Sequence, residues 1–176
     1  MQSEKGVGSV FTVSLPLTLA ILDGQLVQVD EEVYIVPLVS VVESVLVSTQ
    51  QVSIVAGKGR LFRFRDEYIP VISMRQIFGY DDAPMISSDN LMVVVEGGGL
   101  KAGLIVDVLQ GQQQVVIKSL ETHYKHINGF SGATILGNGK VALILDVAGL
   151  MKQSLDADFK RLIRRKNVEE LREEAV

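Results

Sequence analysis

The chain has 176 residues, 47% hydrophobic and 22% charged, so it can bury a substantial core as one domain or two small ones. Its net charge of −4 argues against a nucleic-acid partner, which needs a concentrated basic surface. Cysteine is absent, which excludes disulfides and thiolate ligands and fits a reducing compartment. No apolar run approaches the roughly 20 residues of a spanning helix, and the N-terminus lacks a signal-peptide pattern. We therefore expect no membrane insertion.

The pattern of the N-terminal residues favours the interpretation that the sequence is a piece of a longer protein. They run directly into a short β-type segment at residues 10–13, and Pro16 stands where a strand would end. The Gly6-Val7-Gly8 triplet would let backbone N–H groups approach a phosphate. A single G-x-G is a weak signal, and nothing upstream supplies an adenine pocket, so we expect no nucleotide site.

The first half alternates short apolar runs with turn residues, a pattern typical of β-strands. We expect strands at residues 17–22, 26–29, 33–38, 45–47, 52–55 and 61–64. Asp23-Gly24 predicts a hairpin turn between the first two. Pro37 predicts the end of the third, and residues 39–43 predict a single helical turn. In the last run Phe62 and Phe64 share one face, as in a strand half in a core.

The second half comes after a predicted linker. Residues 79–89 are the longest stretch of turn-forming residues between two apolar patterns. Beyond it we expect strands at 91–95, 102–108 and 115–118, with a turn at the three glycines 97–99. Many of these runs are apolar on both faces, whereas a small barrel has one wet face. The two halves are therefore expected to pack against or interweave with each other.

A hairpin and a capped helical turn are predicted within residues 129–151. Two apolar runs flank Asn138-Gly139, a tight-turn signal. Asp146 comes after the second run, and its carboxylate can accept the free backbone N–H groups of a helix that begins at residue 147.

The same order of elements occurs earlier in the chain. Residues 68–78 align with 141–151, which places Ser73, another N-cap type, opposite Asp146. Residues 33–38 align with 103–108. We favour a duplicated β unit, and two unrelated hydrophobic hairpins are the alternative.

The period changes to helical at the C-terminal end. Apolar residues recur at helical spacing in a charged background from Leu155 to Leu171, which predicts an amphipathic helix. Acidic residues 169–174 oppose the helix dipole, so its end should fray.

Residues with catalytic or metal-binding chemistry are few. His123 and His126 are the two histidines, and no third ligand is indicated near them. Asp107 and Asp146 come directly after apolar strands but are better explained as turn or cap residues. No nucleophile, base and orienting group can be assembled. We therefore expect no catalytic residue, no metal and no cofactor.

Several motifs resemble one signalling family. Residues 6–16 look like the last strand of a histidine-kinase ATP-binding domain, and residues 17–151 resemble the regulatory, CheW-like domain of the chemotaxis kinase CheA. The segments that carry the second resemblance are 17–24, 33–38, 41–44, 66–72, 111–118 and 129–151. The resemblance therefore covers residues 6–151.

The family's fold is all-β: two intertwined five-stranded SH3-like barrels related by a pseudo-repeat, with short helical turns. The resemblance therefore implies a remnant of the preceding domain at 1–16 and barrel subdomains at 17–80 and 90–151, joined by a linker at 81–89. A charged C-terminal helix at 152–176 completes the expected organisation.

The resemblance also implies a function without catalysis. Such a domain docks the adaptor CheW and the cytoplasmic tips of chemoreceptors, and so controls the kinase in two-component signalling. The expected partners are CheW, a chemoreceptor cytoplasmic domain and the other domains of the parent kinase, in the cytoplasm at membrane-associated receptor arrays. A free-standing CheW-type scaffold adaptor is the alternative.

Six residues are carried over as candidate contacts. Val41, Glu43 and Arg65 match receptor-facing positions of CheW-like sequences. The hairpin from residue 52 to 61 resembles the place where the kinase meets CheW, which selects Val52, Ile54 and Leu61. Partly exposed apolar side chains there would form a small patch, and plain barrel core is the alternative for these three.

Overall fold

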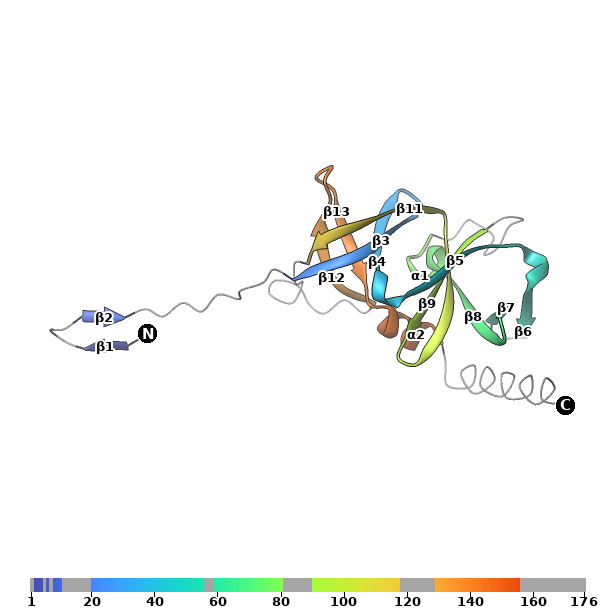
Figure 1. Ribbon diagram of the computed structural model, residues 1–176, viewed down its shortest axis with the longest axis horizontal. Helices are drawn as coiled ribbons and strands as arrows, with labels where there is room; N and C mark the ends of the chain where they lie inside the picture. Colours follow the sequence, from blue (N-terminus) through green and yellow to red (C-terminus); the bar gives the residue numbers. More distant parts are fainter. Residues whose placement is uncertain are drawn as a thin grey trace.

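The computed structural model describes residues 2–4, 6, 8–10, 20–55, 59–80, 90–117 and 129–155, and these are mainly β-strands (Figure 1). The elements of the first half are β1 Gln2–Glu4, β2 Gly8–Val10, β3 Ile21–Val29, β4 Glu32–Pro37, η1 Leu38–Ser40, β5 Val41–Val47, η2 Thr49–Gln51, β6 Val52–Val55, β7 Gly59–Phe64, β8 Glu67–Ser73 and α1 Met74–Ile77. Those of the second half are β9 Asn90–Gly97, β10 Leu100–Val106, β11 Val108–Val116, β12 Phe130–Ile135, β13 Val141–Leu145 and α2 Val147–Ser154.

The two halves of the chain exchange strands. One sheet has the order β5-β9-β10-β8-β7-β6, the other β11-β3-β4-β13-β12, and β1 and β2 form a separate hairpin. Each large sheet is joined across the halves by a parallel pair, β8 with β10 and β4 with β13. In Figure 1 the blue β3 and β4 accordingly lie among the yellow and orange strands of the second half. The predicted interweaving and the all-β class are confirmed.

The six-stranded sheet curls on itself. Its edge strands β5 and β6 are joined directly through η2. The edges of a flat six-stranded sheet lie about 24 Å apart, but the chain from Val47 to Val52 reaches at most about 18 Å. The sheet must therefore bend until its edges approach, and Val47 and Val52 do pack in one core.

Three apolar cores explain why the strands are apolar on both faces. One core lies inside the six-stranded sheet and includes Met92 and Val94, and a second lies inside the five-stranded sheet and includes Ile35. The largest lies between the sheets and takes the alternate residues, such as Val93 and Tyr34. A strand between two cores has no wet face, which is what the doubly apolar runs indicated.

Both predicted helix caps are present. The Asp146 carboxylate accepts the Gly149 backbone N–H at 3.0 Å at the start of α2, and the Ser73 hydroxyl accepts that of Gln76 at 3.4 Å at the start of α1. The equivalent places of Ser73 and Asp146 agree with a duplicated unit.

The predicted turn at Asp23-Gly24 is wrong. Both residues lie inside the continuous strand β3, and the chain turns instead at residues 30–31, where Asp30 has φ 57. Gly24 is needed for close packing: a Cβ there would lie 2.3 Å from Ile35 Cγ2.

The helical turn near residue 40 occupies Leu38–Ser40, so β5 begins earlier than expected. The glutamine-rich residues before 115 also belong to a strand, β11.

Some expectations fall outside the described residues. They are residues 11–19, residue 118 of the expected strand 115–118, the linker 81–89, both histidines and the C-terminal helix beyond Leu155. The domain boundaries remain a prediction, with the added fact that each large sheet uses strands from both halves.

Gly24 provides a test of this packing. Gly24→Ala should lower the free energy of unfolding by about 1–3 kcal/mol, the usual cost of overpacking, because Ile35 is fully buried against it. Gly111→Ala in the neighbouring strand β11 is the matched control, since its Cβ would meet nothing within 4 Å. Urea unfolding measures both. Equal stabilities would contradict the close approach in β3.

Candidate partner-binding surface

The structure brings two of the three receptor-side candidates together. Glu43 lies on the edge strand β5 and Arg65 in the β7–β8 turn, and Arg65 Nη2 is 2.7 Å from Glu43 Oε2. Their side chains are 44% and 67% exposed. Arg65 has φ 54, and its guanidinium also lies over the Phe64 ring at 4.9 Å. Val41 is half-buried and packs against the central core.

An irregularity in β5 shapes this region. The register of β5 against β9 shifts between Val41 and Glu43, so Val42 is the extra residue. Val42 is exposed, and Val39 on η1 is 90% exposed. The Glu43–Arg65 ion pair therefore has exposed apolar residues near it in the chain, a combination suited to a protein partner.

The three CheW-side candidates have different environments. Ile54 on edge strand β6 is 75% exposed, and Val52 is half-buried against the core of the six-stranded sheet. Leu61 is fully buried in the central core. Its expected partial exposure is wrong, because β7 lies between two cores and buries both Leu61 and Phe62. Leu61 is therefore a core residue.

Sequence reasoning missed Leu46. It is 72% exposed on β5, in the strand that leads into η2, whereas Val45 and Val47 pack inside the six-stranded sheet. Alternation within the run 45–47 was the available signal, since one of three consecutive apolar strand residues faces the other way. Leu46 and Ile54 thus provide exposed apolar surface on either side of η2.

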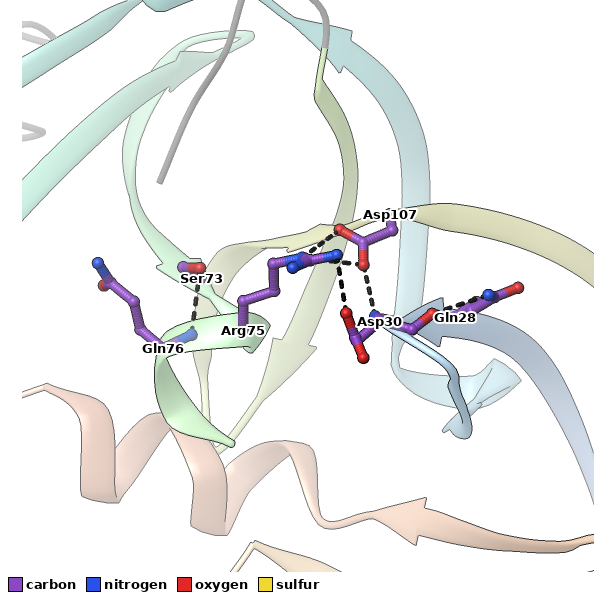
Figure 2. A network of polar contacts seen from close by, with 6 residues as sticks. All are labelled: Gln28, Asp30, Ser73, Arg75, Gln76 and Asp107. Atoms are coloured by element: carbon purple, nitrogen blue, oxygen red, sulfur yellow. Dashed lines mark hydrogen bonds and ion pairs between the residues drawn. The ribbon is translucent and has the colours of Figure 1, made fainter. Parts of the chain in front are cut away.

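A second polar network lies between the two large sheets (Figure 2). Arg75 on α1 donates from Nε to both carboxylate oxygens of Asp107, at 2.9 and 3.0 Å, and its Nη2 is 3.4 Å from Asp30 Oδ1. The Asp30 backbone N–H also donates to Asp107. Partial burial raises the pKa of Asp107, but the hydrogen bonds from Arg75 and Asp30 and the Arg75 charge outweigh it, so the pKa lies below its ordinary value.

The second copy has no acidic side chain at the place of Glu43. The register shift in β5 comes directly after Val41, and the one in β11 comes directly after Leu109. Gly111 therefore stands two residues beyond Leu109 as Glu43 stands two residues beyond Val41. The charge pair is a feature of the first copy.

Comparison with known proteins decides the family. Residues 23–155 match the model of the CheW-like domain. The chain is 43% identical to the chemotaxis protein CheA of Rhizobium meliloti over 162 residues and to that of Salmonella typhimurium over 150, covering 91% and 85% of this chain.

The chain belongs to the CheW-like domain family. It spans about a fifth of the length of these relatives, 21% and 22%. The crystal structure of the scaffolding protein TtCheW from Thermoanaerobacter tengcongensis shares the fold, with a TM-score of 0.60 at 23% identity over 74% of this chain and 92% of that one.

Family membership makes this CheW-like domain a chemotaxis coupling domain, a non-catalytic unit that works through protein–protein interaction. Among the described residues, no group of three or more His, Asp or Glu side chains could hold a metal ion. No helix in that same part of the chain has the length and apolarity to cross a bilayer.

The contrast between the exposed ion pair and buried Leu61 can be measured. Glu43→Gln should change the free energy of unfolding by less than about 1 kcal/mol, as for other exposed ion pairs. Leu61→Ala should cost about 2–5 kcal/mol, because it leaves a cavity in the core. Urea unfolding of both variants checks this. A Leu61→Ala cost as small as that of Glu43→Gln would show that Leu61 is not a core residue.

Proposed function

We propose that this CheW-like domain is the regulatory domain of a chemotaxis histidine kinase. The observation that carries the proposal is 43% identity to CheA proteins over most of the chain. The alignment with the Rhizobium meliloti CheA covers 162 residues, more than the range 23–155 of the CheW-like match. Resemblance to the kinase thus extends beyond the domain shared with adaptors.

In this proposal the domain docks the adaptor CheW and a chemoreceptor cytoplasmic domain, and it passes receptor state to the other domains of its kinase. It acts in the cytoplasm, at membrane-associated receptor arrays. The alternative, a free-standing CheW-type adaptor, has the likeness of the TtCheW fold in its favour. If the gene continues upstream into an ATP-binding domain, the chain is the regulatory domain of a kinase rather than a free-standing adaptor.

We assign the CheW contact to the β6 edge of the six-stranded sheet. Ile54 is its centre, since it is the most exposed apolar residue among the described residues of the hairpin, and the half-buried Val52 lies two residues before it on the same strand. Leu46 extends the apolar surface across η2. The receptor contact is assigned to Glu43, Arg65 and Val41, where an exposed ion pair can exchange partners with charges on a receptor.

The CheW assignment predicts a loss of affinity without a loss of fold. Ile54→Asp should weaken binding of CheW at least about tenfold, the effect of losing an apolar contact worth about 1.4 kcal/mol or more. Ile135→Asp is the control, because Ile135 is an equally large exposed residue on edge strand β12 of the other sheet.

Titration calorimetry with purified CheW compares the affinities, and circular dichroism checks the fold of each variant. If Ile54→Asp binds CheW as tightly as Ile135→Asp does, the β6 edge is not the contact.

The receptor assignment is tested by reversing charges. Glu43→Arg and Arg65→Glu should each reduce capture of a receptor cytoplasmic fragment severalfold, because each puts like charges together and changes the surface offered to the receptor. The double variant restores the ion pair in the opposite order. It should remain deficient if the two side chains contact the receptor directly. Capture restored to the native level would instead assign the pair a purely structural role.

A further inference from the structure

One helical turn, α1, connects the two large sheets. It comes directly after β8 of the six-stranded sheet, yet two of its neighbouring side chains reach the five-stranded one. Phe78 stacks on Tyr34 of β4 with ring centroids 4.3 Å apart. Arg75 bonds to Asp107 and reaches Asp30, the turn residue between β3 and β4. The apolar and the polar contact therefore lie on the same short element.

The ion pairs of Arg75 with Asp107 and Asp30 form what we call the inter-sheet clasp. Asp107 stands where the chain passes from β10 in one sheet to β11 in the other. Figure 2 shows the Arg75 guanidinium between the two carboxylates. The side chains of Arg75 and Asp107 are each 30% exposed and that of Asp30 is 41% exposed, so water and salt reach the clasp.

The duplicated unit makes the equivalent contact with different chemistry. Helix α2 comes after β13 as α1 comes after β8, and its first residues lie against the β9–β10 turn. A Cβ added at Gly97 would lie 3.1 Å from both Ala148 N and Val147 Cγ1. One junction between helix and turn is thus close-packed, and its counterpart is ionic.

We propose that the inter-sheet clasp is a releasable latch, which lets the two sheets turn slightly about the packed contact of α2 with Gly97. An ion pair open to solvent is weak and is screened by salt. A close-packed contact loses its attraction as soon as it separates. Motion between the sheets therefore begins at the clasp, as a small sliding of packed elements.

The purpose of the latch rests on the proposed coupling function. Glu43, Arg65 and Ile54 all belong to the six-stranded sheet or its turns. The residues that precede the domain in the chain lead into β3, the first strand of the other sheet. A small rotation of one sheet relative to the other would transmit a structural change from the partner-binding surface to β3.

The test measures the distance between the sheets in the chain without any partner. Because the sequence has no cysteine, the replacements Leu46→Cys and Ile135→Cys give one exposed spin-label site on each sheet. Asp107→Asn and Arg75→Gln each remove the clasp from one side. Both should shift the electron-spin distance distribution and broaden it relative to the labelled native chain.

Glu67→Gln is the matched control. It removes the ion pair with Lys101, which has similar exposure but joins β8 and β10 within one sheet. It should leave the distribution unchanged. Native protein should also shift towards the variants when salt rises from about 0.01 M to about 1 M, which shortens the Debye length from about 30 to about 3 Å.

The latch proposal is contradicted if the folded clasp variants give the same distance distribution as the native chain, or if Glu67→Gln changes that distribution as much as they do. Circular dichroism checks the fold of each variant. If a variant does not fold, the salt series on the native protein serves as the test instead. Since no partner is present, a negative result leaves the CheW and receptor assignments standing. Conversely, if the binding experiments contradict the CheW and receptor assignments, the latch proposal is unaffected.

Discussion

The structure depends on the exchange of strands between the two halves of the chain. Because β8 pairs with β10 and β4 with β13, neither half completes a large sheet alone. Each shared strand is covered on both faces, by the interior of its own sheet and by the central core. Fully buried residues such as Leu104 and Ile144 contribute about 1.5–3 kcal/mol each, so apolar burial, rather than any ion pair, holds the halves together.

Alternation of apolar residues, helix-cap residues and the internal repeat predicted most of the fold. The predictions failed where one residue pattern can arise from two different structural requirements. Asp23-Gly24 has the composition of a tight turn, but Gly24 is there because Ile35 leaves no room for a Cβ. Leu61 matched the alternation of a half-exposed strand, but β7 lies between two cores at this point and buries Leu61 as well as Phe62. Glu43 and Arg65 were chosen as candidates from the family resemblance, and their ion pair was not predicted, since a contact between residues 22 positions apart across a curled sheet has no local pattern.

The two copies of the repeated unit have kept a backbone and diverged in side chains. At the equivalent place in β11, Gly111 stands for Glu43, so the second copy has no side chain there that could form an ion pair like the exposed one of the first copy. The helix junctions diverged too, one ionic at Arg75 and one packed at Ala148. Pseudo-symmetry of the fold therefore does not imply two equal binding surfaces.

Location decides which residues are free to serve function. Most residues of the central strands are committed to the cores, so exposed side chains suited to a partner lie mainly on edge strands, in turns and near strand ends. Ile54 on β6, Leu46 on β5 and the Glu43–Arg65 pair occupy such places and are well exposed. A surface built this way can change its specificity at little cost in stability, because exposed ion pairs contribute under about 1 kcal/mol each. The doubly buried strands below it keep the same fold throughout such changes.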